Sequence, residues 1–223
     1  MGGLAVIVGS SALTPDGHDL AGVISGAGAV ALQRHGVDDY RPPHLIDHAA
    51  NMRTLAEAGC DRALAIGSVG SLDAGLATGS FVCPHDFIAL HLGVTTFDDA
   101  RGHTLPGFDP EWRRELIAAW GASGAAALRD GGVYWQTKGP RFETPAEIAL
   151  IAPHADVVGM TLAAECIVAR EIGLSYAAVC VVDNLANGVA ARQLSTAALE
   201  AEREANARAL RTSLEAVMPG LVA

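Results

Sequence analysis

Three residues that could bind an anion or move a proton each follow a short apolar stretch of this sequence. Arg34 and His35 come directly after residues 30–33, and Asp183 follows the apolar run 175–182. An arginine binds phosphate through a planar fork of donors. An aspartate can exchange a proton with a ligand when burial raises its pKa. From the residues alone, a surface position for Arg34 and a turn or capping role for Asp183 remain equally open.

Two turns of small residues indicate a cradle for the same kind of anion. Gly9-Ser10-Ser11 follows the apolar run 4–8, and Gly67-Ser68-Val69-Gly70-Ser71 follows the run 62–66. Such turns let backbone N–H groups and hydroxyls approach an anion closely. One turn alone is weak support, but two turns together with Arg34 favour an anion site.

The stretch 139–188 concentrates polar residues where predicted strands end. It opens with Gly139-Pro140-Arg141-Phe142-Glu143, continues through a short strand that ends in Gly159-Met160-Thr161, and closes with Asp183 in a turn. In α/β folds, ligands bind in the crevice beyond the carboxyl ends of the strands. We therefore expect most of any active site in this stretch.

The elements that would position these residues alternate between strand and helix patterns. Short apolar runs predict strands at 4–8, 30–33, 62–66, 81–90, 133–137 and 175–182. Helical spacing predicts helices at 45–58, at 111–129 with a break at Gly121, and at 195–217. Residues 15–28 and 94–110 are expected as loops. The pattern predicts an α/β fold of three layers, α/β/α, around a mixed, largely parallel sheet, as one domain over residues 1–223.

Composition excludes several classes of protein. Half of the residues are hydrophobic and 18% are charged, so a large core is expected. A net charge of −10 and a single lysine, Lys138, argue against nucleic-acid and anionic membrane surfaces. No apolar run approaches a membrane span, and the four cysteines lack metal-like spacing. We expect buried thiols, no bound metal and a cytoplasmic location.

Five motifs in this order resemble the trimeric purine nucleoside phosphorylases, and most closely their 5'-methylthioadenosine and 5'-methylthioinosine phosphorylase branch. They are Gly9-Ser10-Ser11, Arg34-His35-Gly36, Gly67-Ser68-Val69-Gly70-Ser71, Gly139-Pro140-Arg141-Phe142-Glu143-Thr144 and Val158-Gly159-Met160-Thr161. The resemblance implies phosphate-dependent cleavage of a purine nucleoside to the free purine and a ribose-1-phosphate derivative. It also implies a homotrimer, no cofactor, and inorganic phosphate as co-substrate.

The resemblance also assigns residues to the parts of the site. Those expected at the phosphate are Ser11, Arg34, His35, Ser68 and Thr161. Those expected at the nucleoside are Phe142 and Glu143 at the purine, Met160 at the ribose, Asp183 at N7 as the catalytic acid, and His103 lent to a neighbouring subunit.

The sequence departs from the family pattern at the base and at the 5' end of the sugar. Adenine-specific members have Asp-x-Asp where this chain has Asp183-Asn184-Leu185, and members acting on 6-oxopurines pair an Asn with the Glu that matches Glu143. Base preference therefore stays open, with Asn184 able to compensate. No histidine follows His154, so Thr196 and Leu199 are expected to form a wall suited to a 5'-methylthio group, unless they are core residues of an amphipathic helix.

Three alternatives compete with a 5'-deoxynucleoside phosphorylase. A general 6-oxopurine nucleoside phosphorylase would act on inosine and guanosine. A nucleosidase would use water, and Arg34 disfavours it because such sites lack the basic phosphate residue. A non-catalytic nucleoside-binding protein is the third. The segment between Ser11 and Arg34 is short for the family, and its consequence stays open.

Overall fold

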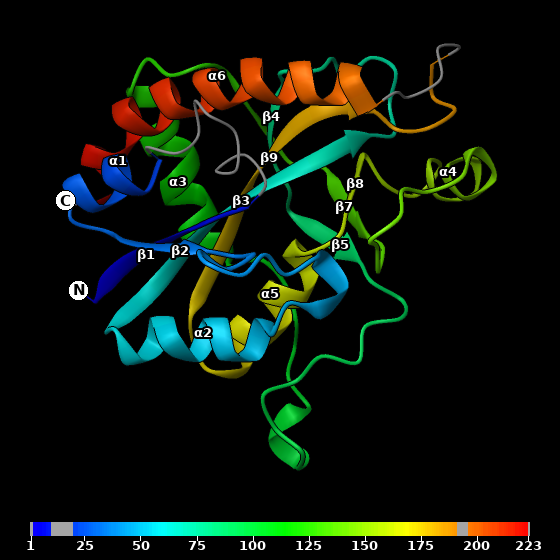
Figure 1. The fold of residues 1–223 in the computed structure, drawn as a ribbon. Coiled ribbons are helices and arrows are strands. Elements are labelled where there is room, and N and C mark those ends of the chain that lie inside the picture. Colours follow the sequence, from blue (N-terminus) through cyan, green and yellow to red (C-terminus); the bar gives the residue numbers. More distant parts are fainter. Residues whose placement is uncertain (1, 10–19, 191–195, 223) are drawn as a thin grey trace.

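The structure is a computed structural model, and it describes residues 2–9, 20–190 and 196–222. A nine-stranded mixed sheet forms its middle layer, in the order β5-β7-β8-β3-β9-β4-β6, with β1 pairing with both β2 and β3 (Figure 1). The strands are β1 (Gly3–Val8), β2 (Val30–Gln33), β3 (Cys60–Ser71), β4 (Phe81–Cys83), β5 (Asp86–Ile88), β6 (Leu128–Asp130), β7 (Val133–Gln136), β8 (Val157–Gly159) and β9 (Ser175–Leu185). The β3–β8 and β4–β9 pairs are antiparallel, whereas the other pairs are parallel. The predicted α/β class with a largely parallel sheet is confirmed.

Helices cover both faces of this sheet. They are α1 (Leu20–Gly26), α2 (His48–Glu57), α3 (Pro110–Ala122), α4 (Pro145–Ile151), α5 (Leu162–Glu171) and α6 (Thr196–Val222), with short 3-10 turns η3 (Pro43–Leu45) and η4 (Ala100–Gly102). One apolar core lies between the sheet and α2 and α5, and a second lies between the sheet and α1, α3 and α6. Along β9, Tyr176 and Ala178 enter the first core while Ala177 and Val179 enter the second, because successive side chains of a strand alternate between faces. This alternation establishes the three layers.

The two central strands are longer than the sequence indicates. Residues predicted as a turn, 67–71, belong to β3, and Asp183 lies within β9. The parallel ladder between β3 and β9 continues to the pair Ser71 and Leu185, with one register shift between Val69 and Gly70 that leaves Asp183 without a partner residue on β3. At Gly67 a Cβ atom would lie 2.7 Å from the Leu162 side chain, so any larger residue would force this buried side chain to move.

Three further element predictions are corrected. Residues predicted as one strand, 81–90, form β4 and β5, which pair with different strands on either side of Pro84, a residue without a backbone donor. The predicted helix 111–129 ends at Ala122, and β6 follows it. Residues 20–26, expected as loop, form α1, whose Leu20 and Ile24 are buried. No helix among the described residues has the length and apolar character needed to cross a membrane.

Candidate active site

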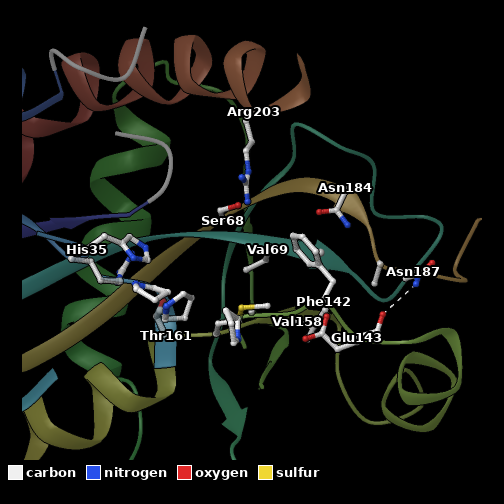
Figure 2. Close-up of a pocket in the computed structure, with 18 of the residues that line it drawn as sticks. His35, Ser68, Val69, Phe142, Glu143, Val158, Thr161, Asn184, Asn187 and Arg203 are labelled. Atoms are coloured by element: carbon white, nitrogen blue, oxygen red, sulfur yellow. Dashed lines mark hydrogen bonds between the residues drawn. The ribbon is translucent and has the colours of Figure 1, made fainter. Parts of the chain in front are cut away.

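A cavity of about 630 Å³ opens at the carboxyl ends of β3 and β9. Figure 2 shows His35 and Thr161 on one side of it, Asn184, Glu143 and Asn187 on the other, Phe142 between them, and Arg203 descending from α6 toward Ser68. The volume lies within the range of small-molecule sites. The cavity therefore brings together residues from the two halves of the chain.

Arg34 is buried at the end of β2 and is held by Glu165 of α5. Its Nε and Nη2 donate to the two carboxylate oxygens of Glu165 at 2.5 and 2.9 Å, and its Nη1 donates to the carbonyl of Ile66 at 2.9 Å. Such a bidentate pair fixes the plane of the guanidinium as well as its position. Arg34 therefore reaches the cavity wall in one orientation.

Glu165 is itself fully buried and is ionised because of its partners. Burial alone would raise the pKa of this carboxyl, but the charge of Arg34 and its hydrogen bonds hold that pKa below its usual value. The hydroxyl of Tyr176 also donates to Glu165 at 2.7 Å, and Nδ1 of His48 lies 3.9 Å from it. The carboxylate thus accepts three hydrogen bonds behind the cavity wall.

His35 lies beside Arg34 in the wall and is neutral at pH 7. Burial lowers its pKa, and the nearby charge of Arg34 lowers it further, while a hydrogen bond to the carbonyl of Arg41 opposes the shift. This 2.7 Å bond requires Nδ1 to carry the proton, because a carbonyl can only accept. Nε2 of His35 is then an acceptor for a protonated ligand oxygen, and the ring is stacked on Tyr40.

Thr161 precedes α5, and its hydroxyl is not used to cap that helix. The capping groups come from β7: Oε1 of Gln136 accepts from the backbone N–H groups of Ala163 and Ala164 at 2.7 and 3.0 Å, and the Tyr134 hydroxyl accepts from the N–H of Thr161 at 3.1 Å. A hydroxyl at a helix N-terminus that makes no capping bond can donate a hydrogen bond to an anion bound there. The residue before it, Met160, also lines the cavity.

Asp183 lies behind the cavity, whereas its neighbour Asn184 lines it. The Asp183 carboxylate is buried, accepts from the hydroxyl of Ser68, and accepts from Nδ2 of Asn206 at 2.8 Å. The β3–β9 ladder is irregular at this point, because Val69 pairs with Val182 and Gly70 pairs with Asn184, which leaves Asp183 without a partner residue on β3. The cavity wall at the end of β9 is therefore formed by Asn184, and the predicted base-facing residue, Asp183, is buried beside it.

The base end of the cavity is formed by Phe142, Glu143 and Asn184. One carboxylate oxygen of Glu143 accepts from the Thr137 hydroxyl at 2.6 Å, and the Glu143 carbonyl accepts from Nδ2 of Asn187 at 3.2 Å. These bonds hold Glu143 in place and leave its second carboxylate oxygen for a ligand. Phe142 remains about half exposed, at 46%, which leaves one ring face available for stacking.

Four of the predicted site residues cannot be placed in the cavity of this chain. Ser11 is outside the described residues, and so are the side chains of Thr196 and Leu199, although both residues belong to α6. His103 is exposed at the end of η4, which projects from the body of the molecule between β5 and α3 (Figure 1). It is not among the cavity residues of its own chain.

Sequence reasoning did not single out five residues that organise the site. They are Gln136, Glu165, Tyr176, Arg203 and Asn206. Glu165 was the most accessible to prediction, because an acid within the otherwise apolar first turns of α5 must have a buried partner. The others depend on contacts between distant segments.

The chain is similar to a protein family model, to several named proteins and to solved structures. Residues 15–218 match the family model described as the phosphorylase superfamily. A protein of Archaeoglobus fulgidus named "probable 6-oxopurine nucleoside phosphorylase" is 41% identical over 187 residues, which cover 84% of this chain and 77% of that protein. A protein of Methanothermobacter thermautotrophicus named "probable S-methyl-5'-thioinosine phosphorylase" is 38% identical over 166 residues, which cover 74% of this chain and 58% of that protein. The solved methylthioadenosine phosphorylase of Schistosoma mansoni with adenine has the same fold, with a TM-score of 0.80, 24% identity, and coverage of 96% of this chain and 90% of that one.

Proposed function

Because the chain belongs to the phosphorylase superfamily, we propose that it cleaves 6-oxopurine nucleosides with inorganic phosphate. The products are the free purine and a ribose-1-phosphate derivative. The observation that carries this proposal is the placement of Glu143 and Asn184 at one end of the cavity whose other end holds Arg34, His35 and Thr161. Relatives named for 6-oxopurine nucleosides and for methylthioinosine support it.

The phosphate end supplies donors and one acceptor. The fixed guanidinium of Arg34 and the Thr161 hydroxyl donate to phosphate oxygens, and Nε2 of neutral His35 accepts from a protonated one. Ser68 contributes through its backbone N–H, since its hydroxyl donates to Asp183. Phosphate held in this way is directed at C1' of the sugar.

The base end favours a 6-oxopurine over adenine. Such a base carries a proton on N1 and acceptors at O6 and N7, so the free oxygen of Glu143 accepts from N1–H and the amide of Asn184 donates to the other side. Adenine has an unprotonated N1, which cannot donate a hydrogen bond to the free oxygen of Glu143. We therefore assign the base-facing role to Asn184 in place of Asp183.

The chemical step breaks the bond between N9 and C1' and forms a bond between C1' and a phosphate oxygen. The electron pair of the broken bond passes to the purine, where negative charge builds up at N7 and O6. Donation from Asn184 strengthens as this charge develops, which is how a fixed donor lowers a barrier. The purine takes up one proton, which in the net reaction is the proton that hydrogen phosphate loses as its oxygen bonds to C1', and the sugar leaves as the 1-phosphate.

The proposed sugar is 5'-methylthioribose, so that 5'-methylthioinosine is the first candidate substrate. Support comes from the absence of any histidine after His154 in the sequence and from Thr196 and Leu199 at the start of α6. Inosine and guanosine are the second candidates, favoured by the 41% identity to the 6-oxopurine relative.

We also propose that the enzyme is a cytoplasmic homotrimer that serves purine salvage. The projecting segment around His103 would contact a neighbouring subunit, and the exposed side chains of Leu90 and Leu105, at 70% and 87%, lie in the same part of the chain. Apolar side chains exposed to this degree are common at subunit contacts.

A panel of nucleosides assayed with and without phosphate tests the proposal. The panel holds methylthioinosine, inosine, guanosine, methylthioadenosine and adenosine. We expect phosphate-dependent turnover of the 6-oxopurines, fastest with methylthioinosine. Turnover that is unaffected by removal of phosphate would instead identify a nucleosidase, and faster turnover of methylthioadenosine would contradict the assignment of the base.

A further inference from the structure

The phosphate end of the cavity needs a cation whose hydrogen-bond donors are not already used by a protein carboxylate. Phosphate at pH 7 carries between one and two negative charges. The charge of Arg34 is matched by Glu165, which accepts from Nε and Nη2 and leaves Nη1 bonded to Ile66. Arg34 can therefore donate hydrogen bonds to phosphate, but the Arg34–Glu165 pair as a whole adds almost no net positive charge.

The other ionisable groups that line the cavity add negative charge, which disfavours binding of an anion. Glu143 and Glu204 both line it, and His35 is neutral because burial lowers its pKa. Among the described residues of the wall, the remaining cation is Arg203. A dianion would be repelled from this cavity without that charge.

Arg203 has a hydrogen-bond donor at the cavity for which the described part of the chain supplies no acceptor. Its side chain runs from α6 toward Ser68, at the phosphate side of the cavity (Figure 2). Its Nε is buried yet has no hydrogen-bond partner. The nearest acid is Asp183, whose Oδ2 lies 3.6 Å away, and that carboxylate is already hydrogen-bonded to Ser68 and Asn206. A separation of 3.6 Å is attractive electrostatically but too long for a hydrogen bond.

We propose that Arg203 is a second phosphate-binding arginine, which lies near Asp183 in the free enzyme and donates to phosphate when phosphate binds. This inference rests on the proposed function. A phosphate oxygen gives Arg203 the hydrogen bonds that Asp183 does not, and charge-assisted bonds of this kind are among the strongest in proteins. It also gives α6, which would carry the 5' wall of the sugar site, a direct contact with the second substrate.

Three variants separate this role from a structural one. Arg203→Gln removes the charge, Arg203→Lys keeps the charge but loses the planar fork, and Arg114→Gln removes an exposed charge from α3 as the matched control. Two properties are measured for each protein and for the wild type. They are the rise in melting temperature on addition of inorganic phosphate, and the KM values for phosphate and for methylthioinosine or inosine.

We expect Arg203→Gln to raise the KM for phosphate by roughly 10- to 100-fold, the cost of losing hydrogen bonds to a charged group. The KM for the nucleoside should change less than about twofold, and the phosphate-induced rise in melting temperature should be lost. Arg203→Lys should lie between wild type and Arg203→Gln, and Arg114→Gln should match the wild type.

A purely structural role gives a different pattern. If Arg203→Gln lowers the melting temperature without phosphate but leaves the KM for phosphate unchanged, or raises both KM values equally, Arg203 only neutralises Asp183 and the inference is overturned. If the wild type itself shows neither phosphate-dependent turnover nor stabilisation by phosphate, the proposed function fails, and the role of Arg203 fails with it.

Discussion

The guanidinium of Arg34 and the carboxylate of Glu165 form a bidentate ion pair, at 2.5 and 2.9 Å, in which both side chains are buried. The pair joins the end of β2 to the first turns of α5, two segments separated by 131 positions in the sequence. It fixes Arg34 at the cavity wall. It also means that the site depends on a carboxylate that never needs to touch the substrate.

Glu165→Gln should destabilise the fold strongly, because Arg34 would remain buried without its counter-charge. Removing one partner of a buried pair costs about 3–5 kcal/mol, and we expect a loss of this size in the free energy of unfolding from urea denaturation. Tyr176→Phe, which removes a single hydrogen bond to the same carboxylate, should cost about 1 kcal/mol. Glu111→Gln, at an exposed pair with Arg114, serves as the control and should change little. Equal effects of the three substitutions would contradict the buried pair.

Asn184→Asp should impair turnover of 6-oxopurine nucleosides far more than Asp183→Asn does. A carboxylate at position 184 cannot donate to the leaving base, and loss of one transition-state donor typically costs roughly 10²–10³-fold in kcat. Asp183 lies behind the wall against Ser68 and Asn206, so Asp183→Asn should act mainly through stability. Steady-state kinetics with inosine or methylthioinosine compare the two. The reverse ranking would restore Asp183 to the base.

Gln136→Leu should weaken the start of α5 and with it the position of Thr161. Oε1 of Gln136 accepts from the N–H groups of Ala163 and Ala164, and Leu would leave both buried donors unpaired. Each such group costs about 1–3 kcal/mol. Gln136→Glu keeps the acceptor but loses the bond that Nε2 donates to the Met160 carbonyl at 3.1 Å, so thermal unfolding should show a smaller loss for it than for Gln136→Leu. A neutral effect of Gln136→Leu would mean that Thr161 caps its own helix.

Stability should fall as the pH is lowered from 7 toward 5, because two histidines are buried in neutral form. Burial lowers the pKa of both His35 and His48 below the usual value of about 6.5. Below about pH 6.5 the two histidines are protonated in the unfolded chain but still neutral in the folded chain. Their contribution to stability is therefore complete above about pH 6.5 and is lost as the pH falls toward the lowered pKa values of the folded chain. His48→Gln should reduce this dependence in denaturation curves measured at several pH values. An unchanged slope would show that His48 titrates normally in the folded chain.

The sequence predicted the layers, the order of strands and helices along most of the chain, and many residues of the cavity wall. Arg34, His35, Phe142, Glu143 and Met160 carry a local signal, since each lies where an apolar run or a Gly-Pro turn ends.

The cavity-facing residue at the end of β9 could not be identified from hydrophobicity. A buried polar residue, Asp183, continues the strand, and the ladder between β3 and β9 is irregular at that point. Glu165, Asn206 and Arg203 act through partners distant in sequence. Such contacts follow from the packing of helices on the sheet, which no local pattern encodes.

The identity of the sugar product tests the central claim most directly. With methylthioinosine or inosine and inorganic phosphate, phosphorus NMR should show a sugar-1-phosphate signal that grows in step with the release of hypoxanthine and is absent without phosphate. Release of hypoxanthine together with free pentose, at the same rate with and without phosphate, would contradict the assignment of Arg34, His35 and Thr161 to phosphate.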